Sequence, residues 1–207
     1  ASMVYIPNTQ IEIVREVPRG RIQHALFDFD GTISLIREGW QQVMIPLMVE
    51  VLLETPQHES EAALTEIVTE FVDRLTGKQT IYQMLQLVEE VAKRGGQPKT
   101  ALEYKWMYLD RLWERIKHRV AGLKGGALRP PDLVVPGALE LLEMLRQRGI
   151  TCYLASGTDH KYVADEASAL GVTPYFVGGV YGALDNYQDF SKAKLIEQIL
   201  RTHDLQG

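Results

Sequence analysis

The chain has 207 residues, 45% of them hydrophobic and 24% charged, which is typical of a globular protein with one or two domains. The formal net charge of −5 argues against a general nucleic-acid binder, which would present a basic face. A single cysteine, Cys152, excludes an internal disulfide and a multi-cysteine metal site. The sequence shows no signal-peptide pattern and no apolar run near the ~20 residues that span a bilayer, so we expect a cytoplasmic location.

Two strand-like segments open the chain. Residues 11–17 alternate apolar and charged side chains before a Pro-Arg-Gly turn at 18–20, which is typical of a small hairpin or an edge strand. Residues 24–27 are mostly apolar and predict a parallel strand buried on both faces. The motif Asp28-Phe-Asp30-Gly31-Thr follows, and its glycine permits a sharp turn of the backbone.

The two carboxylates of this motif point the same way, because a strand turns successive side chains to opposite faces. Like charges at the end of a strand repel each other, and a divalent cation or a shared proton relieves that repulsion. Ligands also bind at the carboxyl ends of strands in open parallel sheets. Asp28 and Asp30 taken alone are equally consistent with an acidic turn, so the later motifs decide between the two interpretations.

Helical periodicity dominates the chain from about residue 36 to residue 122. We predict four helices, separated by short breaks with glycine or proline, at residues 40–53, 59–75, 81–92 and 100–121. Such a run is typical of a compact helical bundle. The pattern assigns five apolar side chains to the inward face of the longest helix: Leu102, Trp106, Leu109, Trp113 and Ile116.

Strands and helices alternate after residue 134. We predict helices at 137–148, 159–170 and 192–201, and strands at 150–155 and 175–177. With the early strand, this alternation favours an α/β fold with a doubly wound parallel sheet. We therefore expect residues 1–33 and 134–207 to form one α/β core domain, and residues 34–133 to form an inserted α-helical cap domain.

Two further groups with phosphate-binding chemistry follow the later strands. Ser156, Gly157 and Thr158 come between a strand and a helix, and the free amides at a helix start bind anions. Lys192 begins the last helix, where a cation opposes the helix dipole and so indicates an anion nearby. Ser156 alone is more often a helix N-cap, and a single lysine is more often a solvated side chain. Together with the carboxylate pair, these groups favour phosphoryl transfer to a carboxylate nucleophile.

Three segments resemble the first three motifs of the haloacid dehalogenase (HAD) superfamily. They are Asp28-Phe-Asp30-Gly-Thr, Ala-Ser156-Gly157-Thr158 and Ser-Lys192-Ala-Lys-Leu-Ile. The resemblance implies a Rossmann-like core, with Asp28 as nucleophile, Asp30 as general acid and base, and Lys192 as the charge-neutralising lysine. It implies Ser156, Gly157 and Thr158 as the phosphate-binding residues. It also implies Mg²⁺ as the cofactor, held by the Asp28 carboxylate and the Asp30 main-chain carbonyl.

The resemblance predicts a Mg²⁺-dependent phosphatase that hydrolyses a small phosphorylated metabolite through an aspartyl phosphate. A phosphomutase would apply the same chemistry to a sugar phosphate. Arg37, Glu38, Lys105 and Tyr108 are candidates to face the cleft from the cap. The residues predict no nucleic-acid partner and no membrane partner, and they leave the oligomeric state open.

The family's fourth motif, an acidic pair at the end of a further strand, has no counterpart after the last predicted helix. The chain is therefore either a fragment of a longer protein or a protein without the acids that anchor the metal. A missing strand would leave the edge of the first strand unpaired, which favours a fragment. In either case we expect this chain to bind Mg²⁺ weakly and to turn over slowly. The alternative is a HAD-like module that binds a phosphorylated ligand or a partner chain without catalysis.

Overall fold

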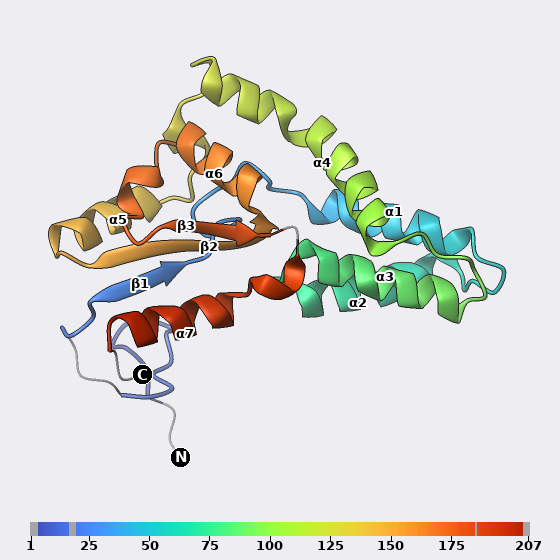
Figure 1. Ribbon diagram of the computed structural model, residues 1–207, viewed down its shortest axis with the longest axis horizontal. Helices are drawn as coiled ribbons and strands as arrows, with labels where there is room; N and C mark the ends of the chain where they lie inside the picture. Colours follow the sequence, from blue (N-terminus) through green and yellow to red (C-terminus); the bar gives the residue numbers. More distant parts are fainter. Residues whose placement is uncertain (1–3, 17–19, 185, 205–207) are drawn as a thin grey trace.

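A parallel β-sheet covered by helices forms one end of the molecule (Figure 1). The computed structural model describes residues 4–16, 20–184 and 186–204. Within these residues the sheet has three strands in the order β1 (His24–Phe27), β2 (Thr151–Asp159) and β3 (Val180–Ala183). Helices α5 (Ala138–Gln147) and α6 (His160–Ala169) lie on one face of the sheet, and α7 (Lys192–Thr202) lies on the other. The predicted doubly wound α/β fold is confirmed.

Strand β1 ends where the two carboxylates begin. It pairs in parallel with β2, with His24 opposite Thr151 and Phe27 opposite Leu154. This register brings the residue after β1 level with the segment of β2 that carries Ser156. The four residues of β1 are half-buried, so the expectation of a strand buried on both faces is wrong. The reason is its place at the margin of the sheet, since in the described part of the chain it pairs with β2 alone.

Four helices follow β1 and pack against one another at the other end of the molecule (Figure 1). They are α1 (Gln41–Leu53), α2 (Glu61–Leu75), α3 (Thr80–Lys93) and α4 (Ala101–Lys124), and we call them the helical block. Helix α4 begins with a capping box, in which the side chains of Thr100 and Glu103 each accept from the other's amide. Such a cap satisfies amides that the first turn leaves unpaired. The four predicted helices are confirmed.

The buried face of α4 differs from the predicted one. Trp106 and Trp113 are 56% and 48% exposed, and Leu102 is 46% exposed. Ile116 is buried as predicted, and the other buried residues of the helix are Tyr104, Tyr108, Leu112, Val120 and Leu123. A tyrosine ring buries well once its hydroxyl has a partner, and the Tyr104 hydroxyl accepts from the Lys99 amide at 3.2 Å. Tyrosine reads as partly polar in a hydrophobicity pattern, so the pattern favoured the neighbouring tryptophan face.

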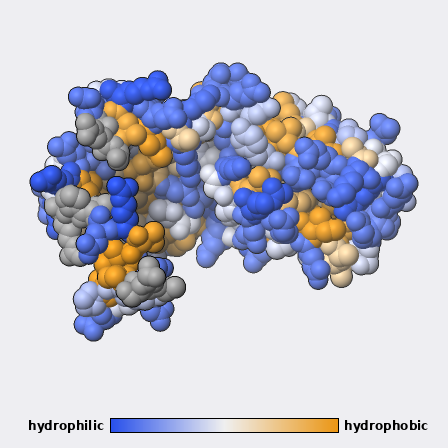
Figure 2. Space-filling view, turned by 90° about the horizontal axis from the view of Figure 1, so that it is seen from below, coloured by the Kyte–Doolittle hydropathy of each residue, from blue (hydrophilic) through white to orange (hydrophobic). Residues whose placement is uncertain are grey.

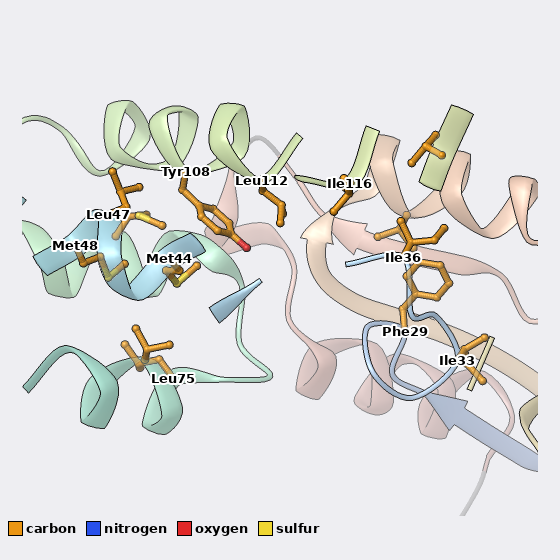
Figure 3. Packing of buried hydrophobic residues seen from close by; sticks show 14 of the residues in the cluster. Phe29, Ile33, Ile36, Met44, Leu47, Met48, Leu75, Tyr108, Leu112 and Ile116 are labelled. Carbon is orange, nitrogen blue, oxygen red and sulfur yellow. The ribbon is translucent and has the colours of Figure 1, made fainter. Parts of the chain in front are cut away.

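One hydrophobic core runs through both ends of the molecule (Figure 3). Phe29 and Ile36, which follow β1, are fully buried and belong to the same cluster as Leu112 and Ile116 of α4. Met44 of α1 continues this cluster into the helical block. The helical block is therefore packed on the turn that carries the two carboxylates, and this packing fixes where the turn can point.

The third strand lies later in the chain than predicted. Thr173–Tyr175 forms a 3₁₀ turn, and β3 begins at Val180, so the strand predicted at 175–177 is wrong. The strand forms in the glycine-rich segment because a glycine there lets the backbone at the start of α6 approach closely. A Cβ on Gly182 would lie only 2.5 Å from the Cα of His160. Glycine in a strand often marks such a contact.

The first described residues form a tight antiparallel turn. Tyr5 pairs with Glu12, and the Ile13 amide donates to the Val4 carbonyl at 2.7 Å. The hairpin thus lies earlier than the predicted one, whose turn at 18–20 falls partly on residues 17–19, outside the described residues.

Seen from the side of α7, apolar patches appear at both ends of the molecule among hydrophilic surface (Figure 2). Among the described residues, no helix combines the length and apolar character that crossing a membrane requires.

Candidate active site

The turn after β1 presents two carboxylates to a cleft between the sheet and the helical block. Phe29 is fully buried, and its carbonyl accepts from the Ile33 amide at 2.9 Å. Gly31 has a φ of +76°, a conformation that favours glycine. Because Phe29 points into the core, its neighbours Asp28 and Asp30 point outward, and both line the same cleft.

The predicted nucleophile and the predicted lysine meet at the carboxyl end of the sheet. Lys192 Nζ lies 2.7 Å from Asp28 Oδ1, and these side chains are 29% and 39% exposed. Ser191 caps α7 by accepting from the Lys194 amide at 3.1 Å. The Lys194 ammonium donates to the Gln188 carbonyl at 2.5 Å instead. Of the two lysines in the motif, the one that reaches Asp28 is Lys192, the lysine that the resemblance implies.

Asp30 is held by two hydroxyls and faces a buried arginine. Its Oδ2 accepts from Thr158 Oγ1 at 3.0 Å and from Ser156 Oγ at 3.3 Å. Arg37 Nε lies 4.0 Å from Oδ1, which is buried and has no hydrogen-bond partner within the described residues. Burial raises the pKa of the Asp30 carboxyl, and the Arg37 guanidinium and the Thr158 hydroxyl counteract this in part. A carboxyl with a raised pKa holds its proton closer to neutral pH, as a general acid requires.

The segment Ser156-Gly157-Thr158 lies in a strand, not at a helix start. Strand β2 continues through it to Asp159, and α6 begins only after that residue, so the expectation of free helix amides here is wrong. The Thr158 amide donates to Ser156 Oγ at 3.1 Å. Gly157 packs under the loop between α2 and α3, where a Cβ would lie 2.3 Å from the Lys78 carbonyl oxygen. The segment therefore offers hydroxyls and a close-packed glycine rather than a helix dipole.

The helical block supplies the far wall of the cleft. Of the four residues expected to face the cleft from the cap, Arg37 and Tyr108 line it. Lys105 Nζ donates to Asp159 Oδ1 at 2.5 Å, which joins α4 to the end of β2. Glu38 is exposed and is not among the described residues that line the cleft. The remaining lining residues of the helical block and its loops are Trp40, Met44, Thr76, Gly77, Lys78, Thr80 and Gln83.

Two buried polar residues were not predicted from the sequence. One contacts a residue that lines the cleft, and the other contacts the segment that precedes Lys192. Glu166 of α6 accepts from Arg37 Nε at 3.0 Å and from Arg37 Nη2 at 2.7 Å. Gln79 donates to backbone carbonyls just before α7. Glu166 had a signal in the sequence, because it lies on the face of α6 that buries Val163 and Ala167. A charged residue on an apolar face is rarely buried unless it is paired.

A family model described as haloacid dehalogenase-like hydrolase matches residues 22–205. This match covers almost the whole chain and includes all three motifs. The chain belongs to the haloacid dehalogenase-like hydrolases. The resemblance found on the motifs is thereby confirmed, and the protein is an enzyme of the hydrolase class.

Solved structures share the HAD-like fold. A predicted phosphoglycolate phosphatase from Haemophilus somnus has a TM-score of 0.54 and 16% identity, over 91% of this chain and 74% of that one. CbbY from Rhodobacter sphaeroides in complex with xylulose-(1,5)bisphosphate has a TM-score of 0.52 and 17% identity, over 89% and 73%. At these identities the likeness concerns the fold alone. A search of curated proteins finds no match.

The HAD-like site offers oxygen donors that suit a divalent cation. Lys192 engages Oδ1 of Asp28, so Oδ2 is the carboxylate oxygen left to meet a cation. In the described part of the chain, no group of three or more His, Cys, Asp and Glu side chains could hold a metal. Mg²⁺ commonly binds through one or two carboxylates together with waters and substrate phosphate oxygens. The donor set therefore fits a divalent cation that completes its coordination with substrate and water, rather than one held in a closed protein cage.

Proposed function

We propose that the chain is a Mg²⁺-dependent phosphatase that hydrolyses a small phosphorylated metabolite through an aspartyl phosphate on Asp28. The observation that carries the proposal is the contact between Asp28 and Lys192 at 2.7 Å, beside the hydroxyls of Ser156 and Thr158. A nucleophilic carboxylate that contacts a cation and shares its cleft with two hydroxyls suits a phosphoryl group, whose charge must be neutralised during transfer.

In the first step, a carboxylate oxygen of Asp28 bonds to phosphorus and the ester P–O bond breaks. Asp30 gives its proton to the leaving oxygen, and the burial that raises the pKa of Asp30 keeps that proton available. Lys192 and the segment Ser156-Gly157-Thr158 hold the phosphoryl oxygens as negative charge moves onto them. The leaving group departs as an alcohol.

In the second step, water attacks the phosphorus of the aspartyl phosphate and gives a proton to the Asp30 carboxylate. The bond between phosphorus and Asp28 breaks, inorganic phosphate leaves, and Asp30 is again protonated. Mg²⁺, when bound, would offset the charge of the carboxylates and of the phosphoryl group. The Asp28 carboxylate and the Asp30 main-chain carbonyl would hold it.

We assign residues 34–133 as a cap that selects the leaving group and excludes water, over a core of residues 1–33 and 134–207. Two observations support this assignment. Arg37, Trp40 and Tyr108 line the same cleft as Asp28, and Lys105 donates to Asp159 at the end of β2. The metabolite would thus be enclosed between the strand ends and the helical block.

Phosphate release from a panel of phosphate monoesters, with and without Mg²⁺, tests the proposal. The panel includes a sugar bisphosphate, because a protein of similar fold was solved with one. We expect slow, Mg²⁺-dependent release that Asp28→Asn abolishes and Asp73→Asn, a change at an exposed carboxylate of α2, leaves intact. Release that never exceeds the Asp28→Asn background would overturn the proposal, and ligand binding without turnover would favour the non-catalytic alternative.

A further inference from the structure

One side chain of the helical block holds the segment that carries Lys192. Gln79 lies at the start of α3 and is 5% exposed. Its Nε2 donates to the Tyr187 carbonyl at 2.8 Å and to the Phe190 carbonyl at 2.6 Å. These carbonyls bracket the turn before α7, and Lys192 follows it after Ser191 alone. In Figure 1 this segment, drawn in red, comes against the start of α3.

Two further contacts seat the same part of the helical block on the core. We call residues 77–82, which comprise the end of the loop before α3 and the first turn of that helix, the docking loop. The Tyr82 and Tyr187 rings meet edge to face, with centroids 5.6 Å apart and planes at 87°. The Lys78 carbonyl lies over Gly157 so closely that a Cβ there would approach it to 2.3 Å. The docking loop therefore touches both core segments that bring phosphate-binding groups to the cleft.

The ion pair at the site is too exposed to place the lysine by itself. The side chains of Lys192 and Asp28 are 29% and 39% exposed, and ion pairs open to solvent hold two long side chains together only weakly. Leu195 of α7 and Phe190 just before the helix are buried together with Ala155 of β2, and this cluster anchors the helix on the sheet. The amide of Gln79 adds a buried hydrogen bond to Phe190 and a part-buried one to Tyr187, and a buried bond is costly to leave unmade. The position of the lysine thus depends on a contact made by the helical block.

We propose that Gln79 is a positioning residue, which places Lys192 against Asp28 when the docking loop is seated on the core. The catalytic consequence rests on the phosphatase function proposed above. When the loop lifts, the two carbonyls lose their donor, and the segment before α7, still anchored at Phe190, no longer holds Lys192 in one position. Closure of the cleft and neutralisation of the nucleophile would then occur together.

Acylation of lysine side chains, measured by mass spectrometry, tests the positioning without a substrate. Gln79→Met keeps the length of the side chain but removes the donor. Gln86→Met is the matched control, because Gln86 also lies on α3 and bonds to Glu90 within the helical block. We expect Lys192 to react several-fold faster in Gln79→Met than in wild type and Gln86→Met, with Lys124 unchanged throughout. Equal rates at Lys192 in wild type and Gln79→Met would overturn the proposal.

Gly157→Ala reaches the same contact by another route. Its new Cβ has to displace the Lys78 carbonyl, while Gln79 itself is unchanged. We expect Lys192 to become more reactive in this variant as well. An unchanged rate at Lys192 would show that the seating of the docking loop does not govern the lysine, and this would overturn that part of the proposal.

Kinetics on an ester that the wild type hydrolyses test the catalytic consequence. We expect Gln79→Met to lower kcat by roughly 10- to 100-fold, as small displacements of a catalytic group do, with a smaller change in KM. Faster acylation of Lys192 with an unchanged kcat would overturn the catalytic role. If the wild type releases no phosphate from any ester, the proposed function fails, and the acylation rates still decide whether Gln79 positions Lys192.

Discussion

Lys192 Nζ lies 2.7 Å from Asp28 Oδ1, although the two residues are 164 positions apart in the chain. One follows the first strand and the other begins the last helix, so the fold of the α/β end brings them together. The lysine balances the charge of the carboxylate, and it can neutralise a phosphoryl oxygen when Asp28 bonds to the phosphorus atom.

Replacing this lysine should remove most of the activity. Lys192→Met eliminates the cation while retaining an unbranched apolar stem, and we expect kcat to fall by about 10²–10³, as for the loss of a donor to a developing charge. Lys194→Met is the matched control, because its ammonium donates to the Gln188 carbonyl instead. Phosphate release under saturating substrate measures both. Equal losses in the two variants would contradict the assigned role.

The alkaline limb of the pH profile should respond to Thr158. Its hydroxyl stabilises the ionised form of Asp30 and so counteracts the rise in pKa caused by burial. Thr158→Val removes that bond, so the pKa of Asp30 rises further and its acid form persists to higher pH. We expect the alkaline limb of kcat/KM, which reports the free enzyme, to move upward. Thr65→Val, at an exposed position of α2, should not move it, and a downward shift in Thr158→Val would refute the acid role.

The buried pair of Arg37 and Glu166 should show strong coupling in stability. Their side chains are 8% and 5% exposed, so Arg37→Met leaves a carboxylate buried without its partner. We expect the free energy of unfolding in urea to fall by about 3–5 kcal/mol. The double variant Arg37→Met/Glu166→Leu should be less destabilised than Arg37→Met alone, and additive losses would count against this. Arg111→Met, which breaks an exposed pair, should cost about 0–1 kcal/mol.

The cap of α4 should matter for stability rather than for catalysis. Thr100→Ala removes the hydroxyl that accepts from the Glu103 amide, and we expect a loss of about 0.5–2 kcal/mol in urea unfolding with KM unchanged. Thr65→Ala, in the middle of α2, should cause no loss, because alanine is the better helix former there. A change in KM without a change in stability would show that this end of α4 contacts the substrate.

Local patterns were enough to predict the elements that position the site. The apolar run before Asp28 predicted β1, and the 3.6-residue period predicted the helical block, because both depend on short-range alternation of side chains. The pattern failed where the environment overrides it. Trp106 and Trp113 are exposed while Tyr104 is buried, and β3 forms in a glycine-rich segment because it packs against the start of α6.

The sequence predicted the polar contacts of the site only where both residues belong to a recognisable motif. Asp28 and Lys192 belong to motifs, and the structure brings them together. Arg37 and Glu166 are 129 positions apart, so no local pattern links them. Gln79 donates to backbone carbonyls, which every residue has, so the partner's sequence gives no sign of the contact. Such contacts follow from how the helical block sits on the sheet, and no short-range pattern encodes that placement.

The pairing of β1 with β2 also governs how the chain assembles. All four helices of the helical block stand between the two strands, so joining them closes a very long loop, and the entropy to be overcome grows with its length. Helices form from near neighbours and precede such distant contacts. A destabilised helical block would therefore slow the refolding of a sheet to which it contributes no strand.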